Sequence, residues 1–416
     1  MPSIGAWFHR YTGQVVLHRP PAHNQNTTSA DYHTPQEEHI VNDRERWVAT
    51  MHYQPVDHVP DEEFGYWKDT FPIWHKQGLP TYVTNNKNAD RYFGFARRES
   101  VGVNVFLKPR FRQRVIEDEA DHQIIINTDG ARAIVHKSGA SSIPHFLEFA
   151  LKNRQDWETT FKPRLNPKTP TRYPADWEER KKEWATRDYP LGVYCGSLYG
   201  WIRDWMGFEN AAMCFYDDPD LIEEMMEHLT NLTLTVIERA VKEVKLDFAA
   251  MWEDMAFNNG PMISPTLFRR FMVPRYKRIT AFLKQHGIDV VYLDCDGNIN
   301  QLVEGWLEAG VNCMFPVEVR AGTDPVELRR RYGRQCLLMG GVDKMRLREG
   351  RAAIRKEIAR IENLVADGGY IPHVDHRCPP DVPYQDYLYY LEVKRAAFGI
   401  PTPERGKKWA KNREEG

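Results

Sequence analysis

Asp289-Val-Val-Tyr-Leu-Asp-Cys-Asp-Gly297 is an apolar run that ends in two aspartates and a glycine. It follows the amphipathic stretch Pro265–Gln285 and precedes a second one, Asn300–Ala309, and both have the spacing of helices. A short run that is apolar almost throughout, between two helices, is typical of a parallel strand covered on both faces. This stretch therefore predicts a strand–helix unit of an α/β fold.

The same alternation recurs along the C-terminal half of the chain, from Pro190 onwards. Apolar runs lie at 191–197, 248–254, 289–297, 311–319, 336–342 and 369–375, and helical stretches between them at 221–243, 265–285, 300–309, 325–332 and 351–366. Strands that alternate with helices predict βαβ units and a parallel sheet. Six units, with one or two more upstream, predict a (β/α)₈ barrel of the TIM type. A doubly wound open sheet is the alternative, and no G-x-G-x-x-G turn supports it.

The N-terminal half of the chain adds other features to this barrel. Residues 1–40 are polar and turn-rich, which predicts an N-terminal arm, and residues 41–400 are the predicted barrel domain. Residues 401–416 form a polar C-terminal tail. Two alternating stretches, Gln123–Asn127 and Ala131–His136, are joined by Thr-Asp-Gly, which predicts a β-hairpin insertion.

Composition excludes several classes of protein. A net charge of −2 gives no electrostatic footprint for nucleic acid or for an anionic membrane surface. No apolar run approaches the roughly 20 residues that span a bilayer, and the N-terminal residues lack the apolar core of a signal peptide. The six cysteines include no C-x-x-C pair. We therefore expect a cytoplasmic protein that binds a small molecule, without a nucleotide cofactor.

Polar residues stand where each predicted strand ends, which is where the chemistry of a (β/α)₈ barrel takes place. Asp294 and Asp296 are two positions apart, so both side chains point to one face of their strand. Two neighbouring carboxylates can share a proton for acid–base work or bind a divalent metal. Capping of the next helix is the alternative for strand-end aspartates.

The remaining candidate residues follow from the same argument. Adjacent strand residues face opposite ways, so only one of Glu253 and Asp254 should enter the barrel mouth, and we expect Glu253, with Asp254 capping or reaching in from the loop. His376 lies before Pro379, Pro380 and Pro383, which stiffen the loop that would hold an acid–base or ligating histidine. The aromatic segment Gly196–Gly207 either closes a pocket over the substrate or packs as a helix start. The predicted substrate contacts are Cys195, Ser197, Tyr199, Trp201, Trp252, Glu318 and His373.

Three motifs resemble a known family. They are Glu45-Arg46-Trp47-Val48-Ala49 with Pro55–Pro60, the turn Met339-Gly-Gly-Val-Asp343 as a variant of G-N-[LV]-D, and His376 with Pro380 and Pro383. The chain from about Glu45 to Phe398 resembles the uroporphyrinogen decarboxylase superfamily, which includes cobamide-dependent methyltransferases. The resemblance implies a (β/α)₈ barrel. It also implies a homodimer, as does the N-terminal arm.

The sequence departs from both branches of that superfamily. Where the decarboxylases carry an arginine-rich R-Q-A-G-R-Y segment that binds the substrate's carboxylates, Phe64–His75 contains no arginine, which argues against uroporphyrinogen as substrate. Where the methyltransferases bind zinc through H-x-C and a later cysteine, this chain has Asp294, Asp296 and His376. With Glu253 as fourth ligand, such an oxygen-rich site could hold zinc, manganese, iron or magnesium.

Three functions stay open at this point. The first is a methyltransferase-like enzyme with a divalent metal, working with a corrinoid protein as a possible partner. The second is a metal-independent decarboxylase or lyase, in which one aspartate stabilises a cationic intermediate and His376 donates a proton. The third is a catalytically inactive barrel that serves as a binding protein.

Overall fold

The strand–helix alternation after Pro190 forms six strands of a parallel sheet, as predicted, and one upstream strand, β1, makes the sheet seven-stranded. A computed structural model of the chain describes residues 41–137 and 144–404, so the predicted arm and residues 405–416 of the predicted tail lie outside the described residues. The strands follow the order β1-β6-β7-β10-β11-β12-β13. Their bounds are Glu99–Ser100, Leu191–Tyr194, Phe248–Trp252, Val291–Asp294, Cys313–Phe315, Leu337–Val342 and Tyr370–Val374.

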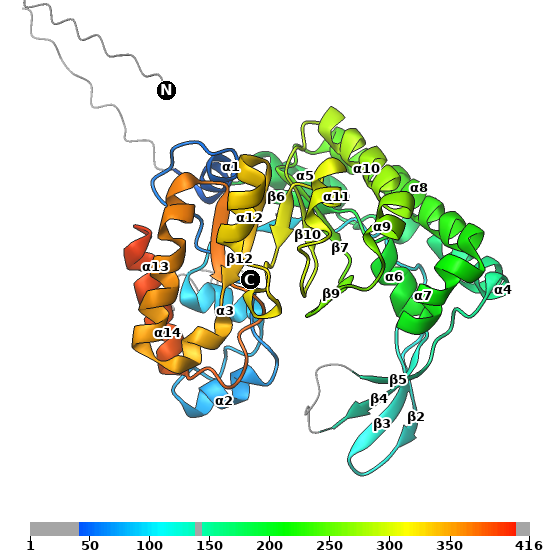
Figure 1. The fold of residues 1–416 in the computed structure, drawn as a ribbon, viewed down its shortest axis with the longest axis horizontal. Helices are drawn as coiled ribbons and strands as arrows, with labels where there is room; N and C mark the ends of the chain where they lie inside the picture. Colours follow the sequence, from blue (N-terminus) through cyan, green and yellow to red (C-terminus); the bar gives the residue numbers. More distant parts are fainter. Residues whose placement is uncertain (1–40, 138–143, 405–416) are drawn as a thin grey trace, which may run out of the picture. The chain divides into compact units, whose positions relative to one another are not determined.

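This sheet curls into a half-barrel (Figure 1). Within the described part of the chain, no strand pairing joins its two edges, β1 and β13. Residues 61–66 run between these edges, because the Ala96 amide donates to the Asp61 carbonyl (2.8 Å) and the Cys378 amide donates to the Gly65 carbonyl (2.9 Å). The parallel α/β sheet is thus confirmed, and its closure into an eight-stranded barrel stays a prediction.

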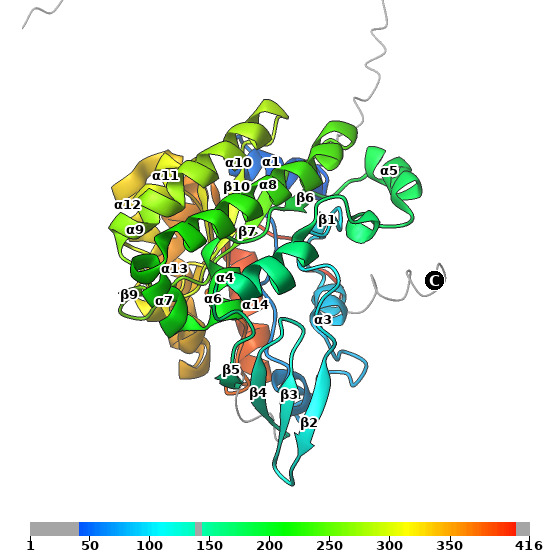
Figure 2. The same ribbon diagram turned by 90° about the vertical axis from the view of Figure 1, so that its right-hand side faces the viewer.

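Helices lie outside the strands, with α8 and α10 over β7 and β10 (Figures 1 and 2). The prediction of one helix over Pro265–Gln285 is wrong, because two helices separated by Met272 occupy it. Pro274, in the first turn of the second helix, cannot continue the first one. No described helix is long and apolar enough to cross a membrane. The helices α1 to α14 are Asp43–Met51, Thr70–Lys76, Asn86–Phe93, Arg154–Asp156, Trp177–Ala185, Tyr199–Met206, Phe208–Asp217, Pro219–Glu243, Pro265–Phe271, Val273–Gln285, Val303–Glu308, Pro325–Tyr332, Arg351–Asp367 and Tyr384–Ala397.

A second, antiparallel sheet has the order β2-β3-β4-β5 (Figure 2). Its strands are Arg114–Asp118, His122–Ile126, Arg132–His136 and His145–Glu148. The two central strands pair antiparallel with His122 opposite His136, and they correspond to the two arms of the predicted hairpin. A two-stranded ribbon of β8 (Ala256–Phe257) and β9 (Gly260–Pro261) follows the end of β7.

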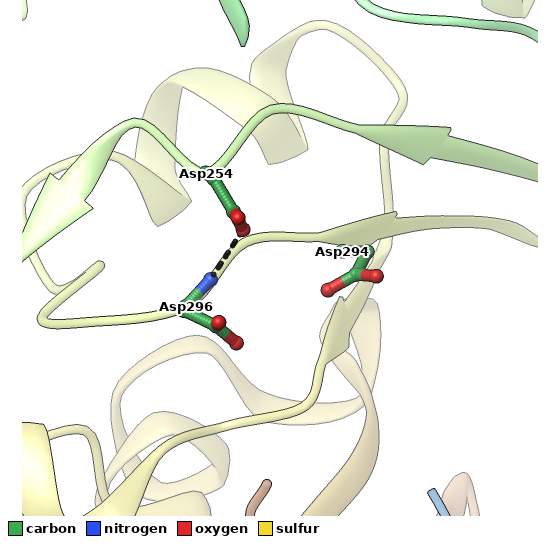
Figure 3. A group of neighbouring side chains, drawn as sticks. All are labelled: Asp254, Asp294 and Asp296. Carbon is green, nitrogen blue, oxygen red and sulfur yellow. Dashed lines mark hydrogen bonds between the residues drawn. The ribbon is translucent and has the colours of Figure 1, made fainter. Parts of the chain in front are cut away.

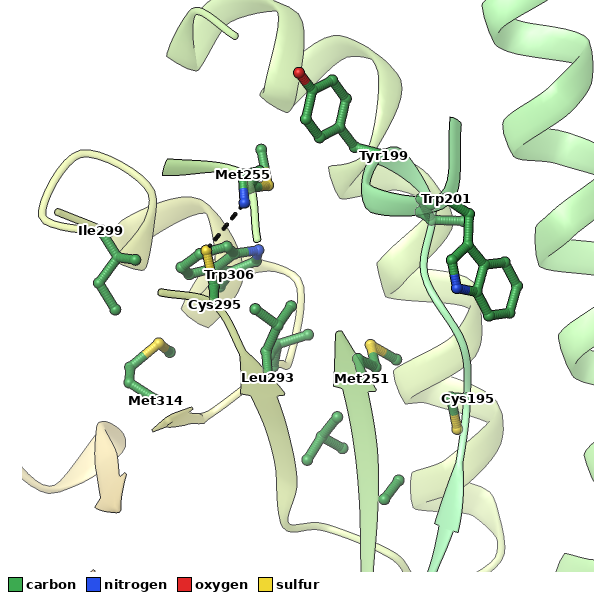
Figure 4. Close-up of a cluster of buried hydrophobic side chains, with 14 of the residues drawn as sticks. Cys195, Tyr199, Trp201, Met251, Met255, Leu293, Cys295, Ile299, Trp306 and Met314 are labelled. Carbon is green, nitrogen blue, oxygen red and sulfur yellow. Dashed lines mark hydrogen bonds between the residues drawn. The ribbon is translucent and has the colours of Figure 1, made fainter. Parts of the chain in front are cut away.

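Strands β7, β10, β11, β12 and β13 of the parallel sheet each contribute residues to two apolar clusters. Met251 and Leu293 pack toward the helices, in the outer cluster that also contains Cys295 and Trp306 (Figure 4). The intervening residues, such as Tyr292, belong to an inner cluster on the concave side of the sheet. The side chains of one strand therefore alternate between an outer and an inner layer, as the two-residue period of a strand requires.

Candidate active site

Three carboxylates meet where β7 and β10 end. One oxygen each of Asp254, Asp294 and Asp296 lies within 4.8 Å of the other two (Figure 3). The strands are neighbours, with Asp294 opposite Trp252, so their carboxyl ends lie side by side. We call these three residues the acid cluster. Asp294 and Asp296 share a face as predicted, because both continue the inner side that Tyr292 occupies.

The structure corrects the prediction for Glu253 and Asp254, because Asp254 rather than Glu253 joins the acid cluster. Alternation along β7 explains this. Phe248 and Ala250 face the inner layer and Met251 the outer one, so Glu253 points outward and Asp254 inward. Asp254 also has a left-handed backbone (φ 41°), and its Oδ1 accepts a hydrogen bond from the Asp296 amide at 3.2 Å.

Glu253 is fully buried and anchors the start of α6. Its carboxylate accepts hydrogen bonds from the amides of Leu198, Tyr199 and Gly200, each at 2.8 Å. The hydroxyls of Ser197 and Tyr276 donate to it as well. Burial raises the pKa of Glu253, and these donors oppose that effect. Every oxygen of Glu253 is thus engaged away from the acid cluster, and the expected role as a fourth metal ligand finds no support in its position.

The charges of the acid cluster are incompletely balanced. Burial, and then the nearby carboxylates of Asp254 and Asp296, raise the pKa of Asp294 well above its usual range. Burial and Asp296 raise the pKa of Asp254 to about 6. Within the described residues, the Asp294 carboxylate forms no hydrogen bond or ion pair, and Oδ1 of Asp296 is buried without a partner. The acid cluster therefore favours the binding of a proton or a cation.

His376 lies beside the acid cluster, as predicted. Its Nε2 is 3.0 Å from Oδ2 of Asp296. Its ring packs against Phe64 (5.4 Å between ring centroids) and Trp67 (5.2 Å). The guanidinium of Arg377 lies over the same two rings, at 5.8 and 5.7 Å from their centroids. Its positive charge opposes the rise in the pKa of Asp294.

The position of Phe64, Trp67 and Arg377 beside His376 was not predicted from the sequence. We call these three residues the aromatic wall, after the two rings that Arg377 covers. Phe64–His75 was notable for its lack of arginine, and its aromatic residues were the available signal. A second missed residue is Arg98, which precedes β1 and enters the inner layer. Its guanidinium lies over the rings of Phe248 and Tyr292, and its Nε is 3.2 Å from a carboxylate oxygen of Glu62.

Four of the predicted substrate contacts lie in the outer core instead. Cys195, Ser197, Tyr199 and Trp201 are all at most 5% exposed. Ser197 serves α6, because its Oγ donates to Glu253 and accepts from the Trp201 amide. The segment Gly196–Gly207 thus packs as a helix start, which was one of its two open interpretations.

The other three predicted contacts lie closer to the acid cluster. Trp252 is partly buried opposite Asp294 in the sheet. Glu318 lines a cavity of about 350 Å³ with Asp296, Gly297 and the β8–β9 ribbon. His373 is 1% exposed in the inner layer, where burial lowers its pKa to about 3. Among the described residues, its Nε2 has no hydrogen-bond partner.

The ligand atoms of the acid cluster are those of a site for a hard divalent cation, and not those of a zinc site built from thiolates. All three members of the acid cluster offer carboxylate oxygens, and His376 adds an imidazole that bonds one of them. Such a set suits manganese, magnesium or iron, and zinc also accepts it. The buried, unpartnered Oδ1 of Asp296 is an acceptor that a cation would satisfy. Cys295, the thiol next to both aspartates, points to the outer cluster (Figure 4).

The fold and this site define a parallel α/β protein with an acidic site at the carboxyl edge of its sheet. The family model described as uroporphyrinogen decarboxylase (URO-D) matches residues 137–396. This match covers more than half of the chain. The chain therefore belongs to the uroporphyrinogen decarboxylase family.

Individual relatives agree with this assignment. A uroporphyrinogen decarboxylase from Granulibacter bethesdensis is 25% identical over 335 residues, which are 78% of this chain and 94% of the relative. One from Campylobacter lari is 20% identical over 224 residues, 51% of this chain and 61% of the relative. The solved structure of a methyltransferase from Methanosarcina mazei shares the fold, with a TM-score of 0.54 and 17% identity over 86% of this chain and 98% of that one. The predicted resemblance to the uroporphyrinogen decarboxylase superfamily is confirmed.

Proposed function

We propose that this protein is an enzyme that acts on a small molecule at the acid cluster, in a methyltransferase-like reaction that a divalent cation supports. The observation that carries the proposal is the convergence of Asp254, Asp294 and Asp296, with a buried and unpartnered oxygen among them. Three carboxylates this close repel one another unless a cation or protons compensate their charge. Part of the proposal is that residues 61–66 close the half-barrel into a TIM-type barrel, with the acid cluster at its mouth.

In this proposal each side chain has a defined task. Asp254, Asp294 and Asp296 would hold the cation, and His376 would orient Asp296 through their hydrogen bond. When bound, the cation supplies a Lewis acid that polarises a substrate oxygen or sulfur. Phe64 and Trp67 shield this side from water, which strengthens the electrostatic interactions inside. A corrinoid-carrying protein is a candidate methyl donor.

A metal-independent decarboxylase is the second candidate, and the raised pKa of Asp294 favours it. A carboxyl group with a raised pKa holds its proton more readily and can donate it to a substrate carbon as carbon dioxide leaves. His376 would then orient the cluster or donate the proton itself. The relatives named decarboxylases agree with this candidate, although Phe64–His75 lacks the arginines expected for a polycarboxylate substrate.

Cation binding separates the two candidates. We expect the purified protein to bind about one equivalent of Mn²⁺, measured by the loss of the free-ion EPR signal and by elemental analysis. Asp254→Asn and Asp294→Asn should each weaken binding tenfold or more, because each removes a charged ligand. Asp289→Asn is the matched control, because Asp289 precedes the same strand at its other end and its side chain is 55% exposed. A protein that binds no cation yet releases carbon dioxide from a carboxylic acid would overturn the first candidate in favour of the second.

A further inference from the structure

Lys344 is a buried lysine just after β12, and no motif of the sequence pointed to it. Its side chain is 11% exposed. The Nζ atom lies 3.1 Å from Oε1 of Glu318 and 3.2 Å from Oδ1 of Asp375. Glu318 follows β11 and Asp375 follows β13, so one ammonium group joins the ends of three neighbouring strands.

Glu318 and Asp375 also lie next to residues of the acid cluster and its histidine. Oε2 of Glu318 accepts a hydrogen bond from the Gly297 amide at 3.0 Å, and Gly297 directly follows Asp296. Asp375, 0% exposed, accepts the amides of Lys344 (3.1 Å) and Arg320 (3.3 Å) and directly precedes His376. Lys344 is therefore connected to both members of the hydrogen-bonded pair, to Asp296 through Glu318 and Gly297 and to His376 through Asp375.

We infer that Lys344 is a positioning residue, which holds Asp296 and His376 in place for the acid cluster. Without its charge, Glu318 and Asp375 would both be left partly or wholly buried with no counter-ion, and Glu318 would turn toward solvent and release Gly297. The loop that carries Asp296 would then lose its anchor. Groups that orient ligands in this way are typically worth 10–100-fold in metal affinity. This inference rests on the proposed cation site.

A second buried lysine provides a matched control. Lys394 in α14 is 0% exposed, and its Nζ lies 2.8 Å from Oδ1 of Asp61. It also donates to the Glu62 carbonyl at 3.2 Å. Among the residues that the structure describes, it forms no hydrogen bond or ion pair with the loops that carry Asp296 and His376. Loss of either lysine removes a cation from a buried carboxylate, although Asp61 keeps its ion pair with Arg395 (2.8 Å), so both losses should destabilise the fold. Only the loss of Lys344 should act on the acid cluster.

The test compares the Mn²⁺ affinity of Lys344→Met, Lys344→Arg and Lys394→Met in the full chain. We expect Lys344→Met to raise the dissociation constant about tenfold. Lys344→Arg should restore most of the affinity, because it keeps the charge. Lys394→Met should leave the affinity within about twofold of the wild type while lowering the melting temperature. Wild-type affinity in Lys344→Met, or an equal loss in Lys394→Met, would overturn the inference.

A second readout does not depend on a cation, so it separates this inference from the proposed function. The chain contains three Asp-Gly pairs, at Gly130, Gly297 and Gly368. Selective labelling of aspartate carbonyls and glycine amides therefore yields only three NMR signals. We expect the Gly297 amide to shift and to exchange with solvent faster in Lys344→Met, and to stay unchanged in Lys394→Met. If the wild type binds no Mn²⁺, the proposed function fails. Independently of that result, a Gly297 signal that is unchanged in Lys344→Met would contradict the positioning role. Should Lys344→Met fail to fold, Lys344→Gln removes the same charge but keeps a polar side chain, and the Gly297 signal decides in the same way.

Discussion

Nε2 of His376 lies 3.0 Å from Oδ2 of Asp296, and this hydrogen bond joins the ends of β13 and β10 across the sheet. The two residues are 80 positions apart in the chain. When Nε2 carries its proton, His376 donates to the carboxylate and restricts its rotation, so that the second oxygen, Oδ1, keeps one direction. Oδ1 is the buried oxygen without a partner.

Replacement of His376 tests whether it orients Asp296. We expect His376→Ala to weaken Mn²⁺ binding about tenfold, because Asp296 becomes free to rotate. His376→Gln retains a donor and should recover part of this loss. His286→Ala is the control, since His286 lies just after α10, where its ring contacts the carbonyl and the ring of Phe282. EPR titration measures all three, and equal affinity in His376→Ala and the wild type would show that the hydrogen bond has no such role.

Glu253 is expected to act on stability rather than on the acid cluster. Glu253→Ala removes the acceptor of five donors at the start of α6, and several of these would become buried without a partner. The free energy of unfolding, from urea titrations followed by circular dichroism, should fall by at least about 3 kcal/mol. The Mn²⁺ affinity of the folded fraction should stay close to that of the wild type. If Glu253→Ala instead keeps normal stability but no longer binds Mn²⁺, Glu253 takes part in cation binding and this prediction is wrong.

Gly297 tests how closely the Asp296 loop must approach the β8–β9 ribbon. A Cβ atom added there would lie 2.5 Å from the Ala256 carbonyl oxygen, and its φ of 88° is left-handed. Gly287, before β10, has a similar φ of 78° with no atom within 4 Å of an added Cβ. Gly287→Ala should therefore cost about 1–2 kcal/mol from backbone strain alone. Gly297→Ala should cost more and also weaken Mn²⁺ binding, since the loop must move. Equal effects of both variants in urea unfolding and EPR would contradict this.

Glu63 predicts a pH dependence of stability. Burial raises its pKa to about 7, although it accepts hydrogen bonds from the amides of Phe64 and Val374. A carboxyl whose pKa is higher in the folded than in the unfolded protein stabilises the fold below its unfolded value, near 4.5. That contribution is lost as the pH rises to about 7. From pH 5 to pH 8, the wild type should lose about 2–3 kcal/mol relative to Glu63→Gln.

Asp90 is the necessary companion in this measurement, because burial and then the charge of Glu63 raise its pKa to about 7 as well. Glu63→Gln removes that repulsion, and Asp90→Asn leaves Glu63 in place. We expect each single variant to reduce the pH dependence and the double variant to reduce it most. Urea unfolding at several pH values measures this, and a slope that the variants leave unchanged would argue against both carboxyl groups as its source.

The alternation of strands and helices could be predicted because its signals are local. An apolar run or a helical spacing is legible within a dozen residues, and α12 over Pro325–Tyr332 agrees with its prediction at both ends. The shared face of Asp294 and Asp296 follows in the same way from their separation by two positions. The break before α10 could also be predicted from the sequence, because Pro274 cannot continue the preceding helix.

Other features depend on which layer a strand faces, and only the tertiary structure decides that. The strand Phe248–Trp252 is apolar on both faces, because the outer cluster covers one side and the inner cluster the other. Its composition therefore could not tell whether Glu253 or Asp254 points inward. Phe64 and Trp67 contact the ring of His376 from a distant part of the chain, and Lys344 contacts Glu318 and Asp375, which adjoin the loops of the acid cluster. Local sequence thus determined where the carboxylates lie along the chain, and the packing of both faces of the sheet determined which of them meet.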